Sequence, residues 1–446
     1  MDNRSHSYLW IALLAWGVLD LVCAMFCEIH ADEAYYRLYG QYLAWGYFDH
    51  PPMVGLLTAL SSALVPAPGT AVAGVALILK NLSVRLATVL LHMATVYIVW
   101  QTIDHGRRVT EADERNTFWR MLLIAASIPM FNAYGFITTP DAPLLFFAAL
   151  FFHSYRRYLD IRSWSMVFPL AVSMAGMMYS KYMAVLVILF VVLGNLQLLR
   201  DGKAWTAVAL AALLMLPHLW WQYSNGFPSF TYHLVSRSTA YQALFTWEFI
   251  PNQLAVFNPL VWALMLWAGW MQLCHGNAYE RSLGMTLIGF QVFFALMTIR
   301  GHVEPHWTMV TSIPAIILLT EDMRLHKRWL TITCGVFAAV VILVRVVLML
   351  NVLPEQTGLA HKQAQITAIH TEAQGRPVVF DGSFQRPSLY RFYYDDQAVL
   401  VRNAYDRYTQ FDLLHLEQDL MGQPACVRRL GKVYITDHLS KEDLRD

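Results

Sequence analysis

The chain has 446 residues, of which 57% are hydrophobic and 14% are charged, and its formal net charge is +1 at pH 7. Soluble domains carry about 25% charged residues, so this composition excludes an ordinary soluble domain and indicates a protein that crosses a membrane several times. A net charge this close to zero gives no general attraction to nucleic acid, and no nucleic-acid partner is expected. The five cysteines show neither a disulfide framework nor a CxxC metal pattern.

Long apolar runs predict about eleven membrane-spanning helices, because a span needs about 20 mainly apolar residues. We expect these spans at about 8–28, 82–101, 119–137, 142–158, 166–180, 182–199, 204–222, 251–273, 283–300, 307–321 and 329–350. The segment 53–80 is also apolar, but "VPAPG" at 65–69 interrupts it. We expect interfacial helices there instead of a further span. No cleavable signal peptide is expected, since the first run is long enough to span.

The distribution of Lys and Arg predicts the orientation, because cytoplasmic loops are enriched in these residues. With the N-terminus inside, the inner loops carry Arg107, Arg108, Arg115, Arg120, Arg156, Arg157, Arg162, Arg200, Lys203, Arg281, Arg324, Lys327 and Arg328. The outer loops carry fewer such residues, namely Arg37, Lys80, Lys181, Arg237 and Arg300. A further span at 53–80 would invert every later loop and remove this alternation.

The polar tail is expected outside the membrane as a small α/β domain. Helices are expected near 355–373, 387–394 and 411–420, and strands at 376–380, 398–401 and 432–436. Strands that alternate with helices predict such a domain, and one this small is marginally stable alone. We therefore divide the chain into a transmembrane domain, 1–353, and a soluble periplasmic domain, 354–446, which packs on the membrane part.

Acids, bases and histidines collect at the outer ends of the predicted spans. They lie in "HADEAYYRLYGQYLAWGYFDHPP" (30–52), at Arg85, in "TTPDAP" (138–143), in "SKY" (180–182) and in "RGHVEPHW" (300–307). Ionisable groups near hydrocarbon are costly and indicate functional sites. A transporter places them at mid-membrane, often in two related halves. Their clustering at one set of helix ends instead favours an enzyme that acts on a lipid-linked substrate at the outer interface.

Each of these residues also has a structural interpretation. Asp32 can cap a helix over 33–45, and Asp141 can cap the span that follows it. The double proline at 51–52 can simply stop a helix, and Lys181 can be a snorkelling lysine. His306 can be an ordinary interfacial residue. Only the joint placement of these residues on one side favours function.

Aromatic and histidine residues nearby are open to the same alternative. Tyr35, Tyr36 and Tyr39 can belong to a belt of aromatic rings at the membrane interface, which we expect for most of them. His218 and His233 are isolated histidines, typical of structural or surface positions.

Several short segments together resemble one known family. They are "DEAYY" (32–36), "GYFDHPP" (46–52), "VRL" (84–86), "TTPDAPLL" (138–145), "SKY" (180–182), "EPHW" (304–307) and "YDRYTQFDL" (405–413). The combination resembles the family-39-like glycosyltransferases of the GT-C superfamily. These are bacterial relatives of the dolichyl-phosphate-mannose protein O-mannosyltransferases and of the lipid A 4-amino-arabinose transferase. The resemblance covers nearly the whole chain.

The resemblance implies a fold and a reaction. The fold has many helices, interfacial helices in the first outer loop and an outer soluble domain. The reaction moves a sugar from a polyprenyl-phosphate donor to a lipid, glycan or protein acceptor, with inversion and without a nucleotide. By matching position, Asp32 is the candidate catalytic base and Glu33 supports it. With a phosphate acceptor, Asp32 would instead stabilise positive charge at the anomeric carbon.

The remaining candidate residues bind the donor or a metal. Cations for the developing phosphate charge are His50, Arg85 and Lys181. Tyr35, Tyr36 and Tyr182 are candidates to contact the sugar or the prenyl chain, and the donor-binding set is completed by Asp141, Glu304 and His306. A divalent metal, zinc or manganese, is a further expectation, with Asp49, His306 and His233 as ligands.

Two departures from the amino-arabinose transferase widen the choice of donor. His50 stands where that enzyme has lysine, and Asp49 stands where it has glutamate, so a hexose donor is as plausible as amino-arabinose. The alternative function is a transporter or flippase of a lipid-linked sugar. We expect the chain in a bacterial inner membrane among membrane lipids, with the N-terminus cytoplasmic and the tail periplasmic.

Overall fold

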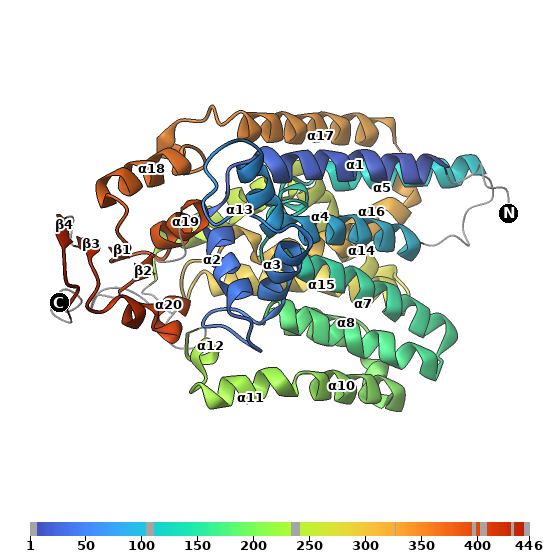
Figure 1. Cartoon of the computed structure of the whole chain (residues 1–446). Coiled ribbons are helices and arrows are strands. Elements are labelled where there is room, and N and C mark those ends of the chain that lie inside the picture. Colours follow the sequence, from blue (N-terminus) through green and yellow to red (C-terminus); the bar gives the residue numbers. More distant parts are fainter. Residues whose placement is uncertain are drawn as a thin grey trace.

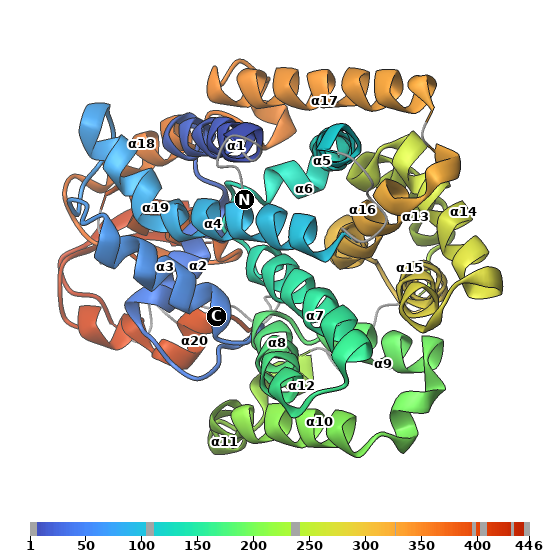
Figure 2. The same ribbon diagram turned by 90° about the vertical axis from the view of Figure 1, so that its right-hand side faces the viewer.

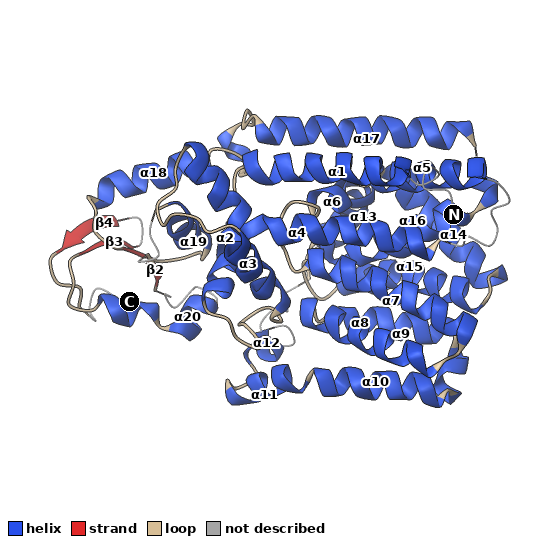
Figure 3. Cartoon of the chain, turned by 45° about the vertical axis from the view of Figure 1, so that its right-hand side comes forward, coloured by secondary structure: helices blue, strands red, loops and turns tan. Residues whose placement is uncertain are grey.

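The computed structural model describes residues 7–103, 111–232, 241–325, 327–394, 398–401, 408–429 and 432–440. Helices lie side by side in one bundle, and a small sheet lies at one end of it (Figure 1). Figure 3 shows that the strands are confined to that end. The described chain is therefore mainly helical, as the composition predicts.

Three described helices are each long and apolar enough to cross a membrane: α1 (Ser7–Phe26), α4 (Gly74–Thr102) and α17 (Arg328–Met349). Two bent pairs also qualify if each pair is one span, α10 (Gly202–Leu214) with α11 (Leu216–Ser224) and α13 (Ala243–Phe257) with α14 (Pro259–His275). The expected number of about eleven spans is not confirmed by this measure and stays a prediction.

Breaks within the apolar runs explain much of this difference. The run expected at 119–137 is divided into α5 (Glu111–Ser127) and α6 (Pro129–Ala133), because Pro129 lacks the amide hydrogen that a continuing helix needs. The remaining bundle helices are α7 (Asp141–Ile161), η2 (Trp164–Met166), α8 (Val167–Ser180), α9 (Ala184–Gly194), η3 (Leu196–Arg200), α12 (Pro228–Thr231), α15 (Ala278–Met297), η5 (Pro305–Thr311), α16 (Ser312–Glu321) and η6 (Met323–Leu325). Figure 2 shows α16 among α5, α13, α14 and α15, and residues 312–320 of α16 are all buried.

The first loop folds into two short helices, α2 (Ala31–Gln41) and α3 (Met53–Leu64). Helix α3 has 12 residues and is about 18 Å long, which is too short to cross a membrane. It ends directly before the "VPAPG" segment, so the expectation of a helix other than a span over 53–64 agrees with the structure. The next helix, α4, begins at Gly74, earlier than expected. Lys80 in α4 fixes the intervening loop by donating to the carbonyl oxygens of Pro68 and Gly69.

The tail contains η7 (Glu355–Thr357), α18 (Lys362–Ala373), β1 (Val378–Phe380), α19 (Gln385–Tyr393), β2 (Val399–Leu400), α20 (Gln410–Leu414), η8 (Leu416–Leu420), β3 (Ala425–Arg429) and β4 (Lys432–Thr436). The sheet order is β2-β1-β3-β4. Strand β1 pairs in parallel with β2 and β3, and β3 pairs antiparallel with β4. The sequence did not predict β3.

The tail and the first loop share one hydrophobic core. Ile29, Tyr35 and Tyr39 pack in the same buried cluster as Phe380 and Phe392 of the tail. Polar contacts add to this packing, because Phe48 N donates to Gln410 Oε1 at 2.9 Å and Gln410 N donates to the Tyr35 hydroxyl at 2.7 Å. The tail therefore packs on the membrane part, while the division into domains 1–353 and 354–446 stays a prediction.

Candidate active site

The acidic pair of the first loop lies at the start of α2, where His30 caps the helix. The His30 side chain accepts from Asp32 N, and the Glu33 carboxylate accepts from His30 N at 3.0 Å, which completes a capping box. Such a pair of reciprocal hydrogen bonds fixes the first turn of a helix. The alternative interpretation of Asp32 as the cap of this helix is wrong, because His30 is the cap and Asp32 lies inside the first turn.

Glu33 is fully buried in a bidentate pair with Arg85 of α4. Arg85 Nε lies 2.8 Å from Glu33 Oε1, and Arg85 Nη2 lies 2.6 Å from Oε2. Thr138 N also donates to Oε1, at 2.9 Å. Complete burial raises the pKa of Glu33, but the charge and hydrogen bonds of Arg85 and the amides of Thr138 and His30 outweigh it, so that the pKa lies below its usual value. Glu33 is therefore ionised at neutral pH and joins α2, α4 and the loop before α7.

The remaining donors of Arg85 point to the end of α1. Nη1 donates to the carbonyl oxygens of Cys27 and Ala24, and Nη2 donates to that of Glu28. With these bonds and the pair with Glu33, each guanidinium nitrogen is already bonded within the protein. In these contacts Arg85 closes the end of α1 against α2, while the expectation that it binds the donor phosphate stays a prediction.

Asp32 differs from its neighbour, because 39% of its side chain is exposed while Glu33 is 0% exposed. His30 Nδ1 lies 3.7 Å from Asp32 Oδ2. Burial lowers the pKa of His30, although the Asp32 charge opposes the shift. His30 is thus neutral at pH 7, and its Nδ1 can accept the hydrogen bond from Asp32 N. Of the two acids, Asp32 is the one that a substrate can reach.

Tyr36, one helical turn after Asp32, lies at the centre of the cluster. Its hydroxyl forms a hydrogen bond with His50 Nε2 at 3.2 Å. Burial raises the pKa of Tyr36 well above its usual value, and the negative charges of Asp32, Asp49 and Asp141 add to the shift. Three carboxylates from different segments therefore lie close enough to Tyr36 to act on it, and the phenol stays protonated as a hydrogen-bond donor.

The other tyrosines of α2 are structural. Tyr39 donates to Asp49, and its ring stacks on Tyr47 with the centroids 4.0 Å apart. The Tyr35 ring packs on Phe384 of the tail at 4.4 Å. Tyr35, Tyr36 and Tyr39 are 1%, 7% and 0% exposed. They are not an interfacial belt. Tyr35 contacts the tail, while its role toward the donor stays a proposal. The belt prediction fails because the tail covers α2.

Asp141, the first residue of α7, forms a buried ion pair with Lys181. Lys181 Nζ lies 2.9 and 2.8 Å from the two carboxylate oxygens of Asp141. His306 Nε2 lies 3.8 Å from Asp141 Oδ2, and the His306 ring packs edge-on against Tyr134. Lys181 is neither a snorkelling lysine nor an unpaired cation. It joins the end of α8 to the start of α7, and η5 lies beside this pair.

Tyr182 belongs to a hydrogen-bond network that anchors the segment around α11 and α12. The Tyr182 hydroxyl lies 3.1 Å from His218 Nε2 and accepts from Gln222 Nε2 at 3.0 Å. His218 Nδ1 donates to Trp45 O at 2.6 Å, and Ser229 Oγ donates to Tyr47 O at 2.7 Å. His218 is structural, as expected. These contacts give the Tyr182 hydroxyl structural partners, while its role toward the donor stays a proposal.

The expected metal site does not assemble within the described residues. No group of three or more His, Cys, Asp or Glu side chains there could hold a metal ion, and His233 lies outside the described residues. Of the expected metal ligands, Asp49 accepts a hydrogen bond from the Tyr39 hydroxyl, and His306 lies beside Asp141. Glu304 is nearby in sequence and partly exposed, 3.7 Å from His302.

The structure adds two groups of residues that the sequence did not reveal. Glu28, at the end of the first span, accepts from the amides of Lys362 and Gln363 at 3.0 and 2.6 Å. It thus binds the start of α18 and brings the tail to the edge of the site. Burial lowers the pKa of Lys362, and the negative charges of Glu33 and Asp32 oppose this shift. No local pattern in the sequence pairs residues this far apart.

The second group lies inside the bundle. Asp20 of α1 lies 2.8 Å from His92 Nδ1 of α4 and 2.7 Å from Arg345 Nη1 of α17. Arg345 Nη2 also donates to Asn132 O at 2.6 Å. Each of Asp20, His92 and Arg345 is an ionisable residue within an expected span, but the sequence does not show that they pair, since they lie on distant spans. These charged side chains pair with one another, so their presence in the spans does not indicate a transport path.

Comparisons with known proteins give a family match, a relative and a fold match. Residues 49–221 match the family of dolichyl-phosphate-mannose-protein mannosyltransferases. The lipid A galacturonosyltransferase RgtD of Rhizobium johnstonii is 24% identical over 345 residues, which are 74% of this chain and 67% of that protein. ArnT from Cupriavidus metallidurans, in a crystal structure bound to undecaprenyl phosphate, matches 95% of this chain and 93% of its own with a TM-score of 0.64 and 15% identity. That likeness shows the fold. Taken together, the matched segment and the curated relative support glycosyltransferase activity for this chain, and its fold is like that of ArnT.

Proposed function

We propose that this enzyme transfers a sugar from a polyprenyl-phosphate donor, with inversion, at the membrane face where α2 and α7 begin. The observation that carries the proposal is the different environment of two adjacent acids. Glu33 is buried and bonded on both oxygens, whereas Asp32 is partly exposed beside Tyr36, whose pKa also responds to Asp49 and Asp141. A rigid, buried support next to a reachable carboxylate is the arrangement that positioned acid–base catalysis requires.

In the proposed step, an acceptor hydroxyl attacks the anomeric carbon from the face opposite the phosphate. The bond between that carbon and the phosphate oxygen breaks, and its electron pair leaves with the polyprenyl phosphate. Asp32 takes the proton of the attacking hydroxyl. A positioned base of this kind contributes about 10²–10⁴-fold to the rate. With a phosphate acceptor no proton is removed, and Asp32 stabilises the positive charge at the anomeric carbon.

The leaving phosphate gains negative charge and needs a donor in place beforehand. Arg85 is committed to Glu33, and the charge of Lys181 is balanced by Asp141. His50 is the candidate that the geometry favours, because it lies 3.2 Å from the Tyr36 hydroxyl and its ring can carry an N–H toward the phosphate. Asp141, Lys181, Glu304 and His306 are proposed to shape the sugar end of the site.

The nature of the donor and acceptor is inferred from the relatives. RgtD is described as acting on lipid A, and ArnT was crystallised with undecaprenyl phosphate. We therefore take an undecaprenyl-phosphate sugar and lipid A as the first pair to test, in a bacterial inner membrane with the site and the tail on the periplasmic side. The same experiment distinguishes a glycosyltransferase from a flippase.

The experiment is mass spectrometry of the lipids that co-purify with the Asp32→Asn protein and with the wild type from the native host. A catalytically stalled transferase should retain a polyprenyl phosphate that carries one sugar, enriched in the variant, and its mass identifies the sugar. A flippase would retain the same lipid equally in both proteins. Bulk phospholipid alone in both samples would contradict a polyprenyl-linked donor.

A further inference from the structure

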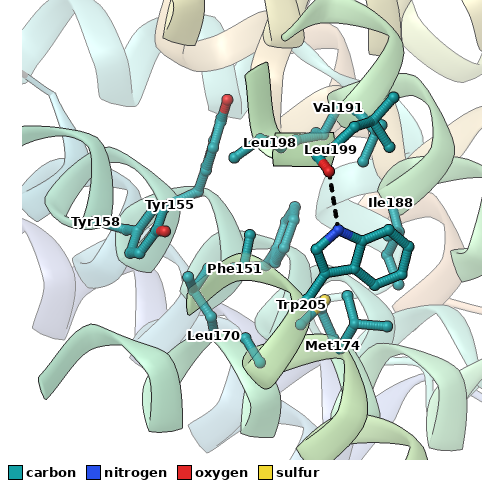
Figure 4. Close-up of a pocket in the computed structure, with 14 residues that line it drawn as sticks. Phe151, Tyr155, Tyr158, Leu170, Met174, Ile188, Val191, Leu198, Leu199 and Trp205 are labelled. Carbon is teal, nitrogen blue, oxygen red and sulfur yellow. Dashed lines mark hydrogen bonds between the residues drawn. The ribbon is translucent and has the colours of Figure 1, made fainter. Parts of the chain in front are cut away.

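An apolar cavity of about 90 Å³ lies at the end of the bundle opposite the candidate site. Its lining comes from α7, α8, α9, η3 and α10. Figure 4 shows the rings of Phe151, Tyr155 and Trp205 around it. Leu199, Trp205 and Val208, which also line it, are 51%, 55% and 40% exposed. The cavity therefore opens toward the surface that hydrocarbon surrounds in a membrane. A space lined by carbon is an unfavourable place for water, so its natural occupant is a hydrocarbon chain.

A second cavity, of about 380 Å³, adjoins the first at Leu198, which lines both. Its lining is polar and includes three cations, Arg162, Arg200 and Lys203, and one acid, Asp201. The Asp201 carboxylate accepts from the Tyr158 hydroxyl and from Lys203 N. The polar cavity therefore has more positively than negatively charged side chains, and Asp201 already has hydrogen-bond donors within the protein.

Asn195 lies at the junction of the two cavities. It is 3% exposed and lines the polar cavity, and its Nδ2 donates to the hydroxyl of Tyr155, which lines the apolar one. Within the described part of the chain, its Oδ1 has no hydrogen-bond partner. A buried acceptor left without a donor is unfavourable, so this oxygen indicates a ligand that brings a hydroxyl or an amine.

We propose that the two cavities together bind one anionic phospholipid from the leaflet on this side of the membrane. A few methylene groups of one acyl chain fill the apolar cavity, the phosphate lies among Arg162, Arg200 and Lys203, and a headgroup hydroxyl donates to Asn195 Oδ1. Basic residues at a membrane surface attract anionic lipids in general. Here an apolar cavity and a polar cavity adjoin at Leu198, and this arrangement matches the apolar and polar ends of one amphiphile. A free phosphate has no acyl chain, and phosphatidylcholine has neither a net negative charge nor a headgroup hydroxyl or amine that could donate to Asn195 Oδ1.

The test is native mass spectrometry of the full chain in detergent, titrated with phosphatidylglycerol, phosphatidylcholine and glycerol phosphate. Phosphatidylglycerol should bind in a one-to-one complex and at least tenfold more tightly than either other compound. Replacing both Arg162 and Arg200 with Gln should weaken its binding by more than tenfold, because each cation near an anionic lipid contributes about fivefold. Both side chains are exposed, so their replacement leaves the fold intact.

Matched variants separate the site from general surface charge. Lys327→Gln with Arg328→Gln removes two exposed cations elsewhere at the same end of the bundle and should leave binding unchanged. Val192→Phe fills the apolar cavity and should weaken phosphatidylglycerol binding more than fivefold. Val340→Phe, on the exposed face of α17, should leave this binding unchanged. Equal losses in both charge variants, equal binding of glycerol phosphate, or unchanged binding in Val192→Phe would overturn the proposal.

Discussion

Replacing Glu33 with Gln should destabilise the protein by about 3–5 kcal/mol, because it leaves a buried Arg85 charge without its counter-ion. The carboxylate accepts four hydrogen bonds, two from Arg85 and one each from Thr138 N and His30 N. A Gln amide has one oxygen and one NH₂ group. Its NH₂ group would therefore face two N–H donors, one from Arg85 and one from the backbone of either Thr138 or His30. The loss therefore includes the charge and at least one buried amide left unsatisfied.

Such a loss is a large fraction of the about 5–15 kcal/mol that stabilises a folded domain. The measurement is denaturant unfolding of the purified chain in micelles, followed by tryptophan fluorescence. Asp32→Asn is the matched control, because it makes the same chemical change at the adjacent and partly exposed acid. It should change the unfolding free energy by less than about 0.5 kcal/mol. A stable but inactive Glu33→Gln protein would refute the assignment of Glu33 as the support and make it a catalytic group.

Three further predictions follow from the same contacts. The difference in unfolding free energy between wild type and Glu33→Gln should shrink as the pH falls below 4.5, the ordinary value for Glu, because the unfolded chain takes up the proton before the folded one does; a constant difference would contradict the ion pair. Lys181→Met should cost about 3–5 kcal/mol by leaving the buried Asp141 charge unpaired, and a second change, Asp141→Leu, should recover most of the loss; losses that add would contradict the pair. Glu28→Gln should speed amide hydrogen exchange at the start of α18, by the loss of about 1 kcal/mol of capping, and unchanged exchange would show that Glu28 does not hold the tail.

Local patterns predict the parts of this fold that local chemistry decides. The "VPAPG" segment ends α3, as expected, because proline and glycine do not continue a helix. Most helices and strands of the tail follow from the alternation of apolar runs and turn residues. Strand β3, "ACVRR", carries two arginines and was missed. Its pairing with β1 comes from the sheet and not from its own composition.

The site was predictable as a cluster but not in its partners. Apolar spans place the ends of α1, α4, α7 and α8 together, so residues near those ends meet without any special signal. Which residue bonds to which depends on tertiary packing. Arg85 is adjacent to no acid in sequence, yet it pairs with Glu33 from another helix. Tyr35 is buried because the tail covers α2, and nothing local to α2 shows that.

The proposed reaction depends most on the different roles of Asp32 and Glu33. The direct test is the single-turnover rate of sugar transfer by wild type and Asp32→Asn, with the donor identified from the co-purifying lipids. We predict that the variant is about 10²–10⁴-fold slower, while its unfolding free energy is unchanged. Transfer by Asp32→Asn at the wild-type rate would contradict the central claim, because the partly exposed acid would then have no part in the reaction.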